Sequence, residues 1–118
     1  MKTLVFVYGT LKNGHHNNHL LSGAFYVGKA HTTQPKYQMY HLGSFPAVTD
    51  NGDKVIQGEI FEVDTQTLAN LDHLEGHPNF YERRLVDVGL YGENHVRKAH
   101  MYLFKGDVTD NMPIEVWR

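Results

Sequence analysis

The chain has 118 residues, of which 41% are hydrophobic and 20% are charged, and this length suits one domain without room for a second independent core. A formal charge of -2 at pH 7, with no block of Lys or Arg, makes nucleic acid a poor candidate for a partner. The absence of cysteine excludes disulfides, thiolate nucleophiles and thiolate zinc sites, so any catalysis must use oxygen or nitrogen groups.

The first apolar run, "TLVFVY", is rich in β-branched and aromatic residues and predicts a strand that is covered on both faces. It is too short for a secretory signal, and no run approaches membrane-spanning length, so we expect a cytoplasmic protein without membrane contact. The loop "GTLKNG" follows. A short helical stretch is then expected at "NNHLLSG", with asparagines where a cap would lie and Gly23 where a left-handed stop would lie.

The middle of the chain reads mostly as β-structure. We predict strands at "AFYVGKA" and "KYQMYHL", and an irregular segment at "GSFPAV". The sequence "DNGD" at Asp50 to Asp53 is typical of a hairpin turn and leads into a further strand, "KVIQGEIFEV".

Two later strands, "YERRLVDV" and "RKAHMYLF", are separated by the turn-rich "GLYGENH" and predict a second hairpin. Five or six strands with one well-marked helix indicate an α+β domain whose sheet is curled or closed into a barrel. We expect residues 1–118 to form this single domain.

The well-marked helix is "DTQTLANLDHLEGHP". Asp64 or Thr65 is placed to cap its start, and Gly76 is placed to stop it, with Pro78 just beyond. The boundaries of this helix are therefore predicted directly from its end residues.

A glutamate interrupts the apolar stripe of that helix. Leu68, Leu71 and Glu75 share one helical face, so Glu75 stands where another leucine is expected. The negative end of the helix dipole and an apolar interior would both disfavour its charged form, which predicts a raised pKa and a role in general acid/base catalysis. The alternative is that Glu75 reaches water or pairs with Arg83 or Arg84.

Asp72 lies one turn before Glu75 and offers a second carboxylate. It either joins the chemistry directly, or faces solvent, or supports a neighbouring loop.

Three histidines, His15, His16 and His19, follow the first strand. The i, i+4 spacing of His15 and His19 would place two imidazoles on one helix face, which is one way to bind zinc. The segment lacks the glutamate of "HExxH" and a third ligand in register, so we expect solvated or capping histidines and no metal.

The loop "GTLKNG" has neither the length nor the Lys-Ser/Thr ending of a P-loop. Gly9 nevertheless lets the backbone approach a ligand closely, and the amides of Gly9, Thr10 and Leu11 would then bind a carboxylate or an oxyanion. The alternative is a plain turn that ends the strand.

Taken together, "VYGTLKNGHHNNHLL", "GSFPAV", "GEIFEV" and "LDHLEGHPNFYERRLV" resemble the γ-glutamylcyclotransferase-like family, and most of all its γ-glutamylamine cyclotransferase branch. The resemblance covers roughly positions 3 to 105. It implies a small mixed-strand β-barrel with flanking helices and a cavity walled by the "YGTL" loop. It also implies that Glu75 is the general acid/base and that the substrate is bound by Tyr8, Gly9, Thr10, Leu11 and Tyr81.

The resemblance further favours a structural role for His19 over metal binding. The C-terminal "GDVTDNMPIEVWR" matches none of the family's motifs, so one rim of the pocket stays undefined.

The implied reaction releases an amine and 5-oxoproline from γ-glutamyl amides such as γ-glutamyl-ε-lysine, with glutathione a poorer substrate. The substrate's own α-amine attacks its side-chain carbonyl, so the enzyme needs no nucleophile of its own and no cofactor. We expect a small-molecule γ-glutamyl substrate and a monomer or weak homodimer. The alternative is a non-catalytic module on the same fold that binds a small molecule or a protein.

Overall fold

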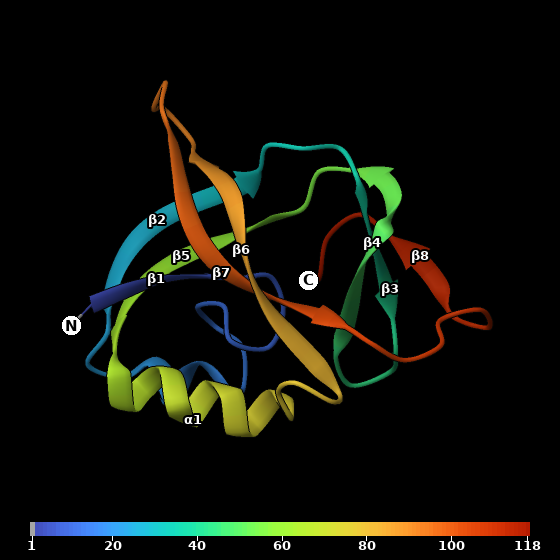
Figure 1. The fold of residues 1–118 in the computed structure, drawn as a ribbon, viewed down its shortest axis with the longest axis horizontal. Coiled ribbons are helices and arrows are strands. Elements are labelled where there is room, and N and C mark those ends of the chain that lie inside the picture. Colours follow the sequence, from blue (N-terminus) through green and yellow to red (C-terminus); the bar gives the residue numbers. More distant parts are fainter. Residues whose placement is uncertain (1) are drawn as a thin grey trace.

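Five strands close into a barrel in the computed structural model, which describes residues 2–118 (Figure 1). Strand β1 pairs antiparallel with β5 and parallel with β7, and this parallel pair closes the barrel in the order β1-β5-β2-β6-β7. The predicted α+β class with a small mixed-strand barrel is therefore confirmed. The five strands are β1 (Lys2–Val7), β2 (Phe25–Thr32), β5 (Gln57–Asp64), β6 (Tyr81–Leu90) and β7 (Val96–Phe104).

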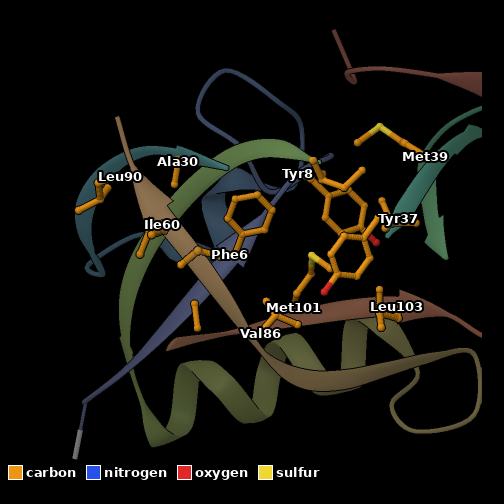
Figure 2. Close-up of a cluster of buried hydrophobic side chains, with 14 residues drawn as sticks. Phe6, Tyr8, Ala30, Tyr37, Met39, Ile60, Val86, Leu90, Met101 and Leu103 are labelled. Atoms are coloured by element: carbon orange, nitrogen blue, oxygen red, sulfur yellow. The ribbon is translucent and has the colours of Figure 1, made fainter. Parts of the chain in front are cut away.

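Strand β1 is covered on both faces, as its continuous apolar run predicted. Phe6 points into a core cluster that fills the barrel and includes Ile60 and Met101 (Figure 2). Val5 and Val7 point the other way, into a second cluster that includes residues of the helix. Successive side chains of a strand alternate between its faces, so one run of valines and phenylalanine supplies both cores.

The helix α1 (Thr65–Glu75) packs outside the barrel, below β1 in Figure 1. The Asp64 carboxylate accepts the amide N–H of Thr67 at 2.8 Å, which caps the first turn. Gly76 adopts a left-handed φ of 64°, and its N–H bonds back into the last turn. Both predicted boundaries are confirmed, and Leu71 is fully buried against the barrel.

The hairpin of β6 and β7 is also confirmed, with a continuous antiparallel register from Tyr81 and Phe104 to Gly89 and Val96. The expected helical stretch after β1 is a short 3-10 helix, η1 (Asn18–Leu21), and Gly23 follows it with a φ of 87°. Because η1 begins at Asn18, His15 lies before it and does not share a helix face with His19.

A second sheet has three strands, in the order β4-β3-β8, and lies to the right of the barrel in Figure 1. Its members are β3 (Tyr37–His41), β4 (Pro46–Lys54) and β8 (Met112–Ile114). The prediction that "GSFPAV" is irregular was wrong for Pro46 to Val48, which begin β4. These three residues are buried and pair with His41, Tyr40 and Met39 of β3, and this tertiary pairing explains the difference.

The predicted hairpin turn at Asp50 to Asp53 was also wrong. Gln38 pairs with Thr49 and Tyr37 pairs with Lys54, so the four residues 50–53 form a bulge inside β4. A Cβ on Gly52 would lie 2.4 Å from the Tyr37 carbonyl oxygen. The glycine therefore allows close contact with the neighbouring strand rather than a reversal of the chain.

The C-terminal segment, for which the sequence offered no structure, supplies β8 and then returns toward the loop after β1. The rings of Trp117 and His41 lie 5.0 Å apart, and Lys12 Nζ donates to the Trp117 carbonyl oxygen at 2.5 Å. Within residues 2–118, no helix has the length and apolar character that crossing a bilayer requires.

Candidate active site

A cavity of about 180 Å³ opens where β1, the end of α1 and the start of β4 meet. An engineered apolar cavity of about 150 Å³ binds benzene, so this space has room for a small ligand. The structure brings together here all the residues that the sequence predicted for catalysis or substrate binding: Tyr8, Gly9, Thr10, Leu11, Glu75 and Tyr81.

Glu75 is the last residue of α1 and lines this cavity half-buried. Burial raises the pKa of its carboxyl group to about 7, in the direction that the sequence predicted. The alternative pairing with arginine was wrong, because Arg83 binds Asp72 at 2.8 Å and Arg84 binds Asp50 and Glu82. Glu75 therefore exchanges its proton near neutral pH without a cation holding it ionised.

Three phenol groups surround Glu75. Burial raises the pKa of Tyr8, Tyr81 and Tyr102, and the nearby charge of Glu75 adds to each shift. Yet none of these phenols donates to Glu75. The hydroxyl of Tyr8 donates to the Tyr102 carbonyl oxygen at 2.6 Å, that of Tyr81 to the Pro46 carbonyl oxygen at 2.7 Å, and that of Tyr102 to Asp72 Oδ1 at 2.6 Å.

Asp72 lies behind the cavity wall rather than in the cavity lining. Arg83 donates to both of its carboxylate oxygens, at 2.8 and 3.1 Å, and Tyr102 adds a third hydrogen bond. Burial alone would raise the pKa of Asp72, but these hydrogen bonds outweigh it and hold the pKa below its ordinary value. Of the alternatives for Asp72, the structure favours a supporting role, because its carboxylate binds the side chains of Arg83 on β6 and Tyr102 on β7.

The loop after β1 is held by two consecutive asparagines that follow it in the chain. Asn17 Nδ2 donates to Thr10 Oγ1 at 2.9 Å, and Asn18 Nδ2 donates to the Leu11 carbonyl oxygen at 2.9 Å. In the described part of the chain, the amide N–H groups of Gly9, Thr10 and Leu11 donate to no other protein group. The loop is thus a turn, as one alternative had it, and it also presents unused donors beside the cavity.

Gly9 approaches β4 so closely that no side chain fits between them. A Cβ at this position would lie 2.5 Å from Pro46 Cγ and 2.8 Å from Pro46 Cδ. The glycine therefore lets the barrel loop and the start of β4 form one wall.

Of the three histidines, only His16 lines the cavity. Its carbonyl oxygen lies 2.9 Å from His19 Nδ1. Across residues 2–118, no cluster of three or more His, Asp or Glu side chains is arranged to hold a metal ion.

Tyr102 is a residue of this site that the sequence interpretation missed. In the strand "RKAHMYLF", Ala99, Met101 and Leu103 point into the barrel core, so the alternation already placed Tyr102 on the opposite face, toward α1. The aromatic and apolar rim was also missed, because it joins segments far apart in the sequence: Phe45, Leu74 and Phe80.

The chain is similar in sequence to proteins of bacteria. A protein-family model described as "Gamma-glutamyl cyclotransferase, AIG2-like" matches residues 5–118. A relative from Vibrio cholerae is 36% identical over 114 residues, which cover 91% of this chain and 96% of the relative. The Escherichia coli "Gamma-glutamylcyclotransferase family protein YtfP" is 35% identical over 112 residues, which cover 94% of this chain and 90% of that protein.

Solved structures share the architecture. An AIG2-like protein from Mus musculus superposes with a TM-score of 0.89 at 24% identity, over 99% of this chain and 88% of the other, which shows the fold alone. The solution structure of ytfP from Escherichia coli has a TM-score of 0.68 at 32% identity, over 97% of this chain and 93% of that chain.

Proposed function

The chain belongs to the family described as gamma-glutamyl cyclotransferase, AIG2-like, and from that membership we propose that it releases an amine and 5-oxoproline from γ-glutamyl amides. The membership confirms the resemblance found in the sequence motifs. The observation that carries the proposal is Glu75, a carboxyl group that pairs with no cation among residues 2–118 and has a pKa of about 7, in a small cavity beside the "YGTL" loop.

In the proposed reaction, the Glu75 carboxylate takes one proton from the substrate's α-ammonium group. The freed amine nitrogen attacks the γ-carbonyl carbon, and the carbonyl electrons move to its oxygen, which closes a five-membered ring. The protonated Glu75 then gives its proton to the departing nitrogen as the amide C–N bond breaks. The ring nitrogen still carries two hydrogens at this stage and gives one to the Glu75 carboxylate, which leaves neutral 5-oxoproline. Glu75 passes this second proton to the free amine, which departs as an ammonium ion, and Glu75 ends as a carboxylate.

The unused amide groups of Gly9, Thr10 and Leu11 are proposed to bind either the α-carboxylate or the oxyanion of the tetrahedral intermediate. The Tyr8 and Tyr81 rings form the walls against which the γ-glutamyl group packs. The cavity has room for the γ-glutamyl group, and the amine part of the substrate then lies at the rim.

That rim supports γ-glutamylamines as the substrates, γ-glutamyl-ε-lysine among them. Phe45, Leu74 and Phe80 present apolar surface there, and Phe45 and Phe80 contact each other at 6.3 Å between ring centroids. Among the described residues that line the cavity, none is Lys or Arg. The four-methylene stem of a departing lysine, or a simple alkyl amine, would pack on this surface, whereas the departing Cys-Gly of glutathione would place a polar peptide group against it.

The test compares three substrates: γ-glutamyl-ε-lysine, a simple γ-glutamyl alkylamide and glutathione. We expect 5-oxoproline release from the first two, with glutathione cleaved far more slowly. Glu75→Gln is the matched control, because it keeps the shape of the side chain, and we expect it to reduce kcat by about 10²-fold or more while circular dichroism shows an intact fold.

Full turnover by the Gln variant would remove Glu75 from the mechanism. A preference for glutathione would overturn the choice of amine but not the role of Glu75. Tight binding of γ-glutamyl amides without turnover would favour the alternative, a non-catalytic binding module on this fold.

A further inference from the structure

The hydroxyl protons of the three phenols around Glu75 all have acceptors elsewhere in the protein. Tyr8 and Tyr81 donate to the main-chain carbonyl oxygens of Tyr102 and Pro46. Tyr102 alone donates to a side chain, the carboxylate of Asp72. A phenol has one proton to donate, so each of these hydroxyls meets any further neighbour as an acceptor.

We propose that Asp72, fixed by Arg83, is a positioning residue that holds the Tyr102 proton away from Glu75, so that the phenols near this carboxyl group act only as acceptors. The inference rests on the proposed role of Glu75 as general acid/base. It goes beyond that role by assigning a task to a carboxylate that does not line the cavity.

The geometry assigns this task to Asp72 rather than to the other two acceptors. A main-chain carbonyl group does not titrate, so the acceptors of Tyr8 and Tyr81 keep one protonation state. Both carboxylate oxygens of Asp72 act purely as acceptors only while the group is ionised, and the paired hydrogen bonds from Arg83 at 2.8 and 3.1 Å keep it so. Arg83 and Asp72 also join β6 to α1, which fixes the carboxylate opposite the hydroxyl of Tyr102.

As a consequence, none of the three phenols donates a hydrogen bond to Glu75. A hydrogen bond donated to a carboxylate stabilises its charged form and lowers its pKa. If the Tyr102 hydroxyl turned toward Glu75, the carboxylate would become a weaker base. The lone pairs of the phenols stay available to a group that carries several N–H donors, as the α-ammonium of the proposed substrate does.

Other ionisable groups lie on the loop after β1 and on the strands β5 and β6. His16 lines the cavity from the loop after β1, and His19 on η1 contacts the His16 carbonyl oxygen. Glu59 on β5 accepts the Asn13 amide N–H at 2.8 Å, and Glu82 on β6 binds Arg84 at 2.7 Å. A test must therefore separate the Tyr102 proton from a general change of charge.

The test measures the pKa of Glu75 directly, by NMR titration of ¹³C-labelled glutamate side chains, with Glu75→Gln identifying the resonance. In Asp72→Ala the Tyr102 hydroxyl loses its acceptor, and we expect it to turn into the cavity that it shares with Glu75. We expect the pKa of Glu75 to fall by about 1 unit. In the double variant Asp72→Ala/Tyr102→Phe no hydroxyl remains, and we expect the pKa to return to its wild-type value.

Two further variants complete the cycle. Glu82→Ala also removes a carboxylate that binds an arginine, but one outside the cavity lining, and we expect no change at Glu75. Tyr102→Phe alone should not raise the pKa of Glu75, because Tyr102 does not donate to it in the wild-type protein. This variant tests the proposal even where Asp72→Ala fails to fold.

An equal fall in the single and double variants would overturn the proposal, because the lost charge of Asp72 would then be the cause. A rise in Tyr102→Phe would overturn it too, because Tyr102 would then be a donor to Glu75. The titration needs no substrate. If the pKa of Glu75 falls in Asp72→Ala and recovers in the double variant, but the wild-type protein turns over no γ-glutamyl amide, this inference is upheld and the proposed function is rejected. If the wild-type protein turns over these amides but the pKa does not change in this way, the proposed function is upheld and this inference is rejected.

Discussion

The barrel with its helix and the three-stranded sheet contribute to the cavity in different ways. The barrel side supplies every ionisable side chain of the lining: Tyr8, His16, Glu75, Tyr81 and Tyr102. The sheet side supplies Ser44, Phe45 and Pro46, none of which titrates near neutral pH. The groups for proton transfer thus lie on the barrel and helix, while the sheet shapes one wall.

The two parts meet at a small number of specific contacts. Tyr81 donates to the Pro46 carbonyl oxygen, Gly9 packs against the Pro46 ring, and Lys12 donates to the Trp117 carbonyl oxygen after β8. Changes on the barrel side should therefore alter stability and chemistry. Changes at the contacts with the sheet should alter substrate affinity.

The largest effect is expected in the core between the barrel and α1. Leu71 is fully buried there, and Leu71→Ala should lower the free energy of unfolding by about 2–5 kcal/mol. Met112 on β8 is 70% exposed, and Met112→Ala should change stability by less than about 0.5 kcal/mol. Urea unfolding at constant m-value measures both. Similar losses in the two variants would contradict the distinction between the barrel and the sheet.

The second effect follows from the pKa of Glu75, which rises from an ordinary value of 4.5 to about 7 on folding. Between these pH values the folded protein holds a proton that the unfolded chain has released, so stability falls as pH rises from 4.5 to 7. The loss reaches about 3 kcal/mol above this window. Glu75→Gln should lack this loss and therefore gain stability relative to wild type as pH rises.

Urea unfolding of both proteins across this pH range provides the measurement. Parallel pH profiles for wild type and Glu75→Gln would show that burial does not raise the pKa of Glu75.

The barrel side was also the more predictable part of the molecule. The helix α1 is marked by local signals, a capping Asp64 and a stopping Gly76, and the burial of Leu71 follows from the 3.6-residue period. A glutamate on that buried face was visible without any tertiary information. The site residues Tyr8 and Tyr81 were predicted from the family resemblance and not from such a local pattern, and they line the same cavity as Glu75.

Of the three strands of the sheet, only β3 was predicted, at "KYQMYHL", because the determinants of the other two are not local. Strand β4 begins at Pro46, and its bulge contains Gly52, whose turn-like sequence instead serves contact with Tyr37. Strand β8 has three residues and forms only by pairing with β3, which lies about 70 residues earlier in the chain, as the partners His41 and Met112 show. No periodic pattern reveals such a partner.

A third prediction concerns the contact between Gly9 and Pro46. Gly9→Ala would place a Cβ 2.5 Å from Pro46 Cγ, so the loop and β4 must move apart. Overpacking of this kind costs about 1–3 kcal/mol, and where this cost opposes substrate binding it corresponds to a KM increase of about 5- to 150-fold. Steady-state kinetics with a γ-glutamyl amide provides the measurement.

Pro46→Ala removes the ring atoms that clash, so the double variant Gly9→Ala/Pro46→Ala should recover most of the affinity. A double variant as weak as Gly9→Ala alone would show that the added methyl group acts on the substrate and not on the contact with the sheet.

The smallest effect is expected at the link between the "YGTL" loop and the C-terminal segment. Lys12 Nζ donates to the Trp117 carbonyl oxygen at 2.5 Å, and Lys12→Met keeps the aliphatic stem while removing this donor. One such hydrogen bond contributes about 0.5–1.5 kcal/mol, only part of which reaches the substrate, so KM should rise about 2- to 5-fold. Because Lys12 does not line the cavity, kcat should stay unchanged. Lys54→Met, at the exposed end of β4, is the control and should leave both KM and kcat unchanged. A fall in kcat for Lys12→Met at constant KM would give Lys12 a part in the chemistry, and the division of tasks between barrel and sheet would then be wrong.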